Sequence, residues 1–240
     1  MQKNNAKVIV LSFAAFAFAM LMVVGCTTSP ALAQAKKSAY PAMAPLSEYM
    51  MPESAEIALA RSGAPKSISD GAEVMVLRHG GYATAVKGTN GFLCVVERGW
   101  GAATDDPEFW NPKVRAPICF NPAAARTFAP IYLMKTKLVF AGKSKTEILQ
   151  ATDSAFAKRE LPALERGSMC YMLSKDQYLN DIGKSWHPHV MIVVPGDVAK
   201  SWGANLAGSP VIAANDPEER VTIFMVWVGK WSDGTAAPMD

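Results

Sequence analysis

The sequence predicts an α+β fold, with a largely antiparallel sheet of about five to six strands and two to three helices packed on it. Apolar and β-branched runs of strand length fall into two groups, one before Asn121 and one after Ser168. A helical block with its own capping signals lies between them. Strand groups that flank helices, rather than alternate with them, are typical of α+β proteins.

The N-terminus has the features of an export signal. Lys3 and Lys7 precede an apolar run over residues 8–25, and Ala31-Leu32-Ala33 fits the small-residue pattern of a cleavage site. We therefore expect residues 1–33 to be a signal peptide and the remainder to be exported, either periplasmic or extracellular.

Two alternatives to cleavage after Ala33 stay open. The run "VVGC" resembles a bacterial lipobox, in which Cys26 is lipidated and tethers a lipoprotein to the membrane. The apolar run is also nearly long enough to be an uncleaved anchor. Cleavage after Ala33 and both of these alternatives place the rest of the chain outside the cytoplasm.

After processing, residues 34–46 predict a flexible tether and residues 47–240 a single α+β domain. The formal net charge is +3, and two of the lysines belong to the leader. This near-neutral balance lacks the basic stripe of a nucleic-acid-binding protein. No second segment is apolar enough to predict an integral membrane domain after processing.

In the first half of the domain, Pro52 and Gly63 bracket a short helix, and Asn90-Gly91 predicts a hairpin turn. Strands are predicted at residues 72–77, 82–86, 92–97 and 118–120.

In the second half, Asn121-Pro122 caps a helix expected to end near Lys135, and the capping box from Ser144 to Glu147 opens another. Strands are predicted at residues 169–173, 189–194 and 221–229, with a short helix at 197–203 and a loop at 205–219.

The stretch "VMVLRHGG" resembles the start of a histidine phosphatase active site through Arg78-His79-Gly80. That family needs a helix after the histidine, whereas residues 82–97 here have a hairpin pattern. A polar β-connection is therefore the expected role of this tripeptide, and a phosphatase-like enzyme is the weaker alternative.

His187 and His189 are candidate catalytic and metal-binding residues. An extended i, i+2 pair points to one side of the chain, and Pro188 keeps His187 extended. The pair could hold zinc with His79, Glu97 or Asp105 as a third ligand, for a metal-dependent hydrolase. Two alternative roles for these histidines are general acid–base catalysis without a metal and purely structural hydrogen bonding. Glu97 is the further catalytic candidate.

The long segment 98–117 contains aromatic and charged residues, and such loops are often functional. Trp100, Trp110 and Arg115 are its candidate ligand-binding residues. The alternative, which we favour, is that its aromatics cover the core.

Three cysteines remain after either processing event, which permits at most one internal disulfide. We expect Cys94 to pair with Cys119 because they are closest in sequence, leaving Cys170 free. The alternative is that all three are buried thiols.

The strings "KGTNGFLCVVERGW", "DDPEFWNPKVRAPICFNPAAAR", "MCYMLSKDQYL" and "WHPHVMIVVP" resemble a family of bacterial exported proteins without an assigned activity. The resemblance covers nearly all of the mature chain and implies export and a single domain. It assigns no catalytic residue. The function expected from the sequence is thus a ligand-binding or structural domain of the envelope, binding a small molecule or peptide, with catalysis undecided.

Overall fold

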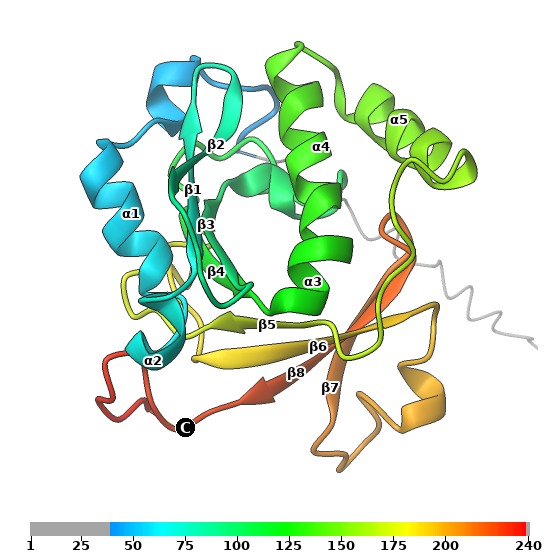
Figure 1. The fold of residues 1–240 in the computed structure, drawn as a ribbon. Helices are drawn as coiled ribbons and strands as arrows, with labels where there is room; N and C mark the ends of the chain where they lie inside the picture. The colour runs from blue at the N-terminus through cyan, green and yellow to red at the C-terminus, as the bar shows by residue number, and fades with distance from the viewer. Residues whose placement is uncertain (1–38, 239–240) are drawn as a thin grey trace, which may run out of the picture. The chain divides into compact units, whose positions relative to one another are not determined.

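The computed structural model describes residues 39–238, and these form an α+β domain built on one eight-stranded sheet (Figure 1). The predicted fold class is confirmed, but the sheet is larger than predicted and is mixed. The export signal, the lipidation candidate Cys26 and residues 34–38 of the expected tether lie outside the described residues. The strands are β1 (Glu73–Arg78), β2 (Gly81–Val86), β3 (Leu93–Glu97), β4 (Ala116–Phe120), β5 (Met169–Met172), β6 (His189–Pro195), β7 (Ile212–Asp216) and β8 (Val221–Trp227).

The strand order is β2-β1-β3-β4-β5-β6-β8-β7. All neighbours are antiparallel except β1 and β3, which are parallel because the chain makes the β1–β2 hairpin before β3 returns to the other side of β1. Strand β7 falls within the predicted loop 205–219, so that part of the prediction was wrong. It pairs only with β8 and forms one edge of the sheet.

Helices cover the two faces of the sheet unequally. The main helices are α1 (Glu53–Arg61), α2 (Lys66–Ser69), α3 (Pro122–Thr127), α4 (Ala129–Phe140) and α5 (Lys145–Ala157). Helix α1 packs on the outer face of β1, β3 and β4, while α3 and α4 lie on the inner face, around which the sheet curves (Figure 1).

The helix boundaries follow their capping residues. The Asn121 side chain accepts a hydrogen bond from Ala124 N, and Ser144 and Glu147 form a complete capping box. The single helix predicted to end near Lys135 is two helices: α3 ends before Phe128, and α4 continues to Phe140. Pro130 lies in the first turn of α4, where a missing N–H costs nothing.

Cys94 and Cys119 form a disulfide between the antiparallel neighbours β3 and β4, with their Cα atoms 4.1 Å apart. It is the pair expected from the sequence. Both residues point to the outer face and are buried with Ala60 of α1. Cys170 is a buried free thiol.

Within residues 39–238, no helix has the length and apolar character required to cross a membrane.

Candidate functional site

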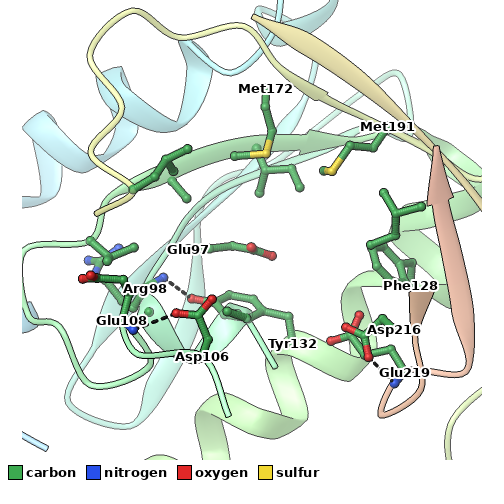
Figure 2. A pocket seen from close by; sticks show the side chains of 18 of the residues that line it. Glu97, Arg98, Asp106, Glu108, Phe128, Tyr132, Met172, Met191, Asp216 and Glu219 are labelled. Atoms are coloured by element: carbon green, nitrogen blue, oxygen red, sulfur yellow. Dashed lines mark hydrogen bonds between the residues drawn. The ribbon is translucent and has the colours of Figure 1, made fainter. Parts of the chain in front are cut away.

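A cavity of about 400 Å³ lies on the inner face of the sheet, between the strands and α4 (Figure 2). Alternate residues of the central strands point into it, because side chains two apart in a strand share a face. Residues from several strands, from α4 and from the connecting segments form its apolar wall. The wall includes Val114, Ala116, Ile118, Phe120, Phe128, Tyr132, Met172, Leu179, Met191 and Ile223.

Glu97 ends β3 and carries its carboxyl group to this cavity (Figure 2). No side chain or backbone group of residues 39–238 hydrogen-bonds to that carboxyl group. The segment that turns away after β3 passes close to it, since a Cβ on Gly101 would lie 2.8 Å from Glu97 Oε2. Burial, reinforced by the charge of Glu219 and opposed by that of Lys135, raises the pKa of Glu97 to about 8.

Glu219 is a second buried carboxyl group on the cavity wall, in the turn before β8. Lys135 of α4 reaches it with Nζ 3.3 Å from Glu219 Oε1 and also donates to Ala102 O at 2.8 Å. Burial raises the pKa of Glu219 to about 7, although the lysine opposes that change. The carboxyl groups of Glu97 and Glu219 therefore both hold their protons more tightly than exposed glutamates.

Three further carboxyl groups line the cavity, and each is held by local hydrogen bonds. Asp106 accepts from Glu108 N at 2.7 Å, Glu108 accepts from Asn111 Nδ2, and Asp216 accepts from Glu219 N at 2.9 Å. These contacts fix the side chains but neutralise no charge, so the cavity wall carries an excess of acidic groups.

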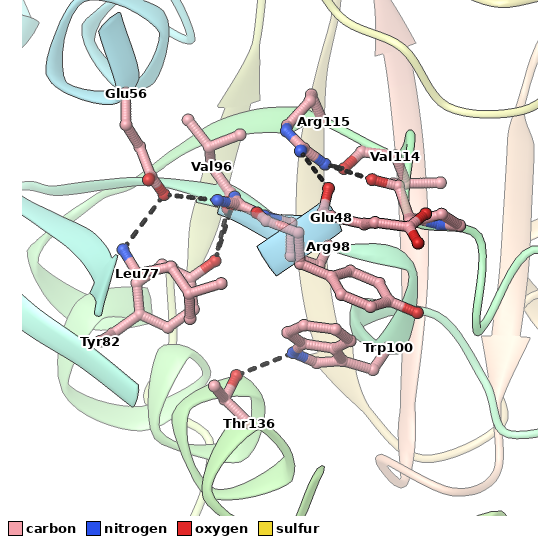
Figure 3. A network of polar contacts seen from close by, with 12 residues as sticks. Glu48, Glu56, Leu77, Tyr82, Val96, Arg98, Trp100, Val114, Arg115 and Thr136 are labelled. Carbon is pink, nitrogen blue, oxygen red and sulfur yellow. Dashed lines mark hydrogen bonds and ion pairs between the residues drawn. The ribbon is translucent and has the colours of Figure 1, made fainter. Parts of the chain in front are cut away.

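Arg98, also on the cavity wall, is neutralised by a buried partner behind it (Figure 3). Its Nη2 donates to Glu56 Oε1 at 2.9 Å, its Nε donates to Tyr49 O at 2.8 Å, and a third nitrogen donates to Val96 O. Glu56 also accepts from Leu77 N at 3.1 Å. This network ties α1 to β1 and β3 and leaves the positive charge of Arg98 unavailable to a ligand.

The structure does not bring the three histidines together. His79 lies in the tight turn of the β1–β2 hairpin, and no helix follows it, unlike the strand-to-helix arrangement of histidine phosphatases. The His187 ring stacks on Trp227 with centroids 4.8 Å apart, and His189 is buried with Nδ1 2.7 Å from His187 O. Among residues 39–238, no group of three His, Cys, Asp or Glu side chains is placed to hold a metal ion.

The aromatic residues proposed from the segment 98–117 lie in the core rather than on the cavity wall. Trp100 is fully buried and donates to Thr136 Oγ1 at 3.0 Å, and Trp110 is 6 % exposed. The Arg115 guanidinium donates to backbone carbonyls, including Pro112 O at 2.7 Å and Glu48 O at 3.1 Å. Other residues of this segment line the cavity instead, among them Arg98, Asp106, Glu108 and Val114.

Of the residues singled out from sequence, Glu97 is the one that reaches the cavity, whereas Glu219 on the cavity wall and its partner Lys135 were missed. A signal for Lys135 was present. It lies four residues after Ile131 and three after Tyr132, so helical periodicity puts a lysine on the buried stripe of α4. A lysine on an apolar stripe indicates a buried acidic partner.

Comparisons with protein-family models, with curated proteins and with solved structures found no match. The resemblance to bacterial exported proteins therefore stays a prediction.

Proposed function

We propose that this chain is an exported binding protein whose cavity takes a small organic cation with an apolar body. The observation that carries the proposal is the Glu97 carboxyl group, which faces a largely apolar cavity without a hydrogen-bond partner among the described residues. Glu97 is partly buried, and a carboxyl group in such a place without a hydrogen-bond partner costs stability. An ammonium ligand would supply both the missing hydrogen bond and the opposite charge.

The other charges of the cavity support the same ligand class. Among the described lining residues the acidic groups outnumber the single basic one, Arg98, and both Arg98 and the nearby Lys135 already contact buried glutamates. An anionic ligand would meet no free positive charge on this wall. The apolar wall, with the flexible side chains of Met172 and Met191, suits an aliphatic or aromatic body. A cavity of about 400 Å³ has the size of small-molecule sites.

Calorimetry with three ligands of matched shape tests the proposal. We expect 2-phenylethylamine to bind, and 2-phenylethanol and phenylacetate to bind at least about tenfold more weakly, because they lack the cation. Glu97→Gln should weaken amine binding by a similar factor. Glu160→Gln, at an exposed position away from the cavity, is the matched control.

Binding of the amine should strengthen as the pH rises from 6 to 9. At pH 6 Glu97 is protonated and must lose its proton to form the ion pair, whereas above its pKa of about 8 it is already ionised. Equal binding of the alcohol and the amine, or unchanged binding in Glu97→Gln, would contradict the proposal.

A second candidate is acid–base catalysis in the same cavity, favoured by two carboxyl groups whose pKa values are raised to about 8 and about 7. Groups with pKa values near neutrality suit proton transfer. Turnover of a hydrolysable cationic ester that falls to background in Glu97→Gln and Glu219→Gln would favour this candidate over simple binding. The metal-dependent hydrolase predicted from His187 and His189 gains no support, because within residues 39–238 no three metal-ligating side chains come together.

Export is proposed on the N-terminal sequence alone. Mass spectrometry of the protein recovered from a bacterial envelope fraction tests it: a chain beginning at Gln34 indicates cleavage after Ala33, and a diacylglyceryl group on Cys26 indicates a lipoprotein. The near-neutral chain supports no nucleic-acid partner.

A further inference from the structure

A second cavity of about 410 Å³ lies where the end of α5 and the segment after it approach the ends of β6 and β8. Most of its lining is formed by side chains without charge. All but Thr127 are apolar, and they are Thr127, Ile131, Phe156, Leu161, Pro162, Ala163, Leu164, Pro195 and Val221. Such a lining favours an alkyl or aryl group over a polar one.

Two arginines, Arg159 and Arg220, line the same cavity. Arg159 follows the last turn of α5 and is exposed, and its guanidinium has no hydrogen bond or ion pair with residues 39–238. Arg220 has its guanidinium carbon 4.8 Å from the centre of the Phe156 ring. It also pairs with Asp153 at 3.4 Å, but both side chains are about half exposed, so this pair is weak.

Both arginines have positive φ values of 59°, a conformation that glycine adopts more readily than any other residue. Keeping a long cationic side chain at each of these two turns therefore costs conformational free energy. The two turns are separate in sequence, one after α5 and one before β8, and both present an arginine to one apolar cavity.

The acidic groups near this cavity do not cancel the two arginines. Glu219 also lines it, but its carboxyl group contacts Lys135 and its pKa is raised to about 7 by burial. Asp153 is exposed, and within residues 39–238 its carboxylate forms an ion pair with Arg220 alone. A ligand here meets an apolar interior and a guanidinium that needs an anion, which is the reverse of the charge in the cavity at Glu97.

We propose that this second cavity binds a free medium-chain alkyl carboxylate, with the chain against Phe156 and Leu161 and the carboxylate paired with Arg159 and Arg220. A guanidinium binds a carboxylate through two parallel N–H···O hydrogen bonds, which gives this head group an advantage over an alcohol. The carboxylate contacts proposed here do not involve Glu97, although Glu219 lines both cavities.

Calorimetry with decanoate, below its micelle concentration, tests the proposal on the full chain. We expect saturable binding at about one site per chain, and at least about tenfold weaker binding of decanol and decylamine. The double variant Arg159→Gln/Arg220→Gln should lose at least about tenfold in affinity. Arg126→Gln is the matched control, because Arg126 is an exposed arginine that pairs with Glu165 and does not line the cavity.

A second variant tests the cavity without touching the charges. Ala163→Trp, at an exposed position of the lining, should fill the cavity and abolish decanoate binding while the melting temperature stays within a few degrees. The proposal is overturned if decanol binds as well as decanoate, if the double arginine variant binds normally, or if Ala163→Trp leaves binding intact. Absence of decanoate binding at millimolar concentration, with or without binding to phosphatidylglycerol vesicles, overturns it as well.

Discussion

Lys135 and Glu219 are in contact at the boundary between the two cavities: the lysine Nζ lies 3.3 Å from Glu219 Oε1, and Glu219 lines both cavities. The two side chains are 2 % and 8 % exposed. They join α4 to the turn before β8 across 84 positions of sequence. Because the pair is buried, loss of one partner leaves the other without compensation.

Lys135→Met should therefore lower the free energy of unfolding by about 3 kcal/mol at pH 8. The loss should shrink at pH 5.5, because Glu219, whose pKa is already about 7, is then protonated and carries no uncompensated charge. Urea unfolding at both pH values measures this. Lys137→Met, two positions on and exposed, is the control, and an equal loss in both variants would refute the role of the ion pair.

Helix α1 carries two glutamates in ion pairs, and we expect their removal to lower the free energy of unfolding by very different amounts, because the pair of Glu56 with Arg98 is buried. Glu56→Ala should cost about 3–5 kcal/mol, because Arg98 and Leu77 N lose a fully buried acceptor. Glu53→Ala removes an exposed ion pair with Arg78 and should cost less than about 1 kcal/mol. Equilibrium unfolding in urea compares the two variants, and similar losses would mean that the buried network contributes little.

The raised pKa of Glu97 predicts how stability depends on pH. Its pKa is about 8 in the folded chain against an ordinary value of 4.5, so between these values the folded chain keeps a proton that the unfolded chain releases. The contribution of Glu97 to the free energy of unfolding is therefore greatest below pH 4.5 and declines as the pH rises toward 8.

Glu97→Gln should remove that decline. A pKa difference of 1 corresponds to about 1.4 kcal/mol, and we expect the variant to exceed the wild type by at least about 1 kcal/mol at pH 8.5 and to match it more closely at pH 5. Urea midpoints across this range are the measurement. A wild-type and variant pair with parallel pH profiles would show that Glu97 titrates normally.

The disulfide predicts a thiol count and a stability change. In a chain beginning at Gln34, maleimide labelling under denaturing conditions should modify one cysteine before reduction and three after it. Cys94→Ala/Cys119→Ala should lower the free energy of unfolding by about 3.5 kcal/mol, the loop-closure contribution for a separation of 25 residues. Three reactive thiols before reduction would contradict the bond.

Local signals predicted much of the fold. The capping box at Ser144, the cap at Asn121 and the apolar runs of the central strands act over a few residues, so they can be identified without knowing the rest of the chain. Strand β7 was missed because "IAAND" is short, weakly apolar and paired on one side only. Its pairing depends on β8, which lies beyond it in the chain.

The candidate site was harder to predict, because it depends on contacts between distant segments. Glu97 was predicted as a possible third metal ligand and as a catalytic candidate, but its place on a cavity wall was not predicted. Its neighbours Lys135 and Glu219 come from α4 and from the turn before β8. His187 and His189 were predicted to form a site because of their i, i+2 spacing, yet the Trp227 ring stacks on His187 and the Trp186 ring packs against His189.

The positions of the three cysteines have a consequence for oxidative folding. Cys119 and Cys170 lie on adjacent strands, but their registers differ by one residue, since Cys119 pairs with Tyr171 and Phe120 pairs with Cys170. Their sulfur atoms therefore lie on opposite sides of the sheet. Thiol–disulfide exchange requires a thiolate to attack a sulfur directly, so the formed sheet separates the attacking group from its target. Once β4 and β5 have paired, the disulfide can no longer be reshuffled by this cysteine, and any wrongly paired chain must unfold to correct itself.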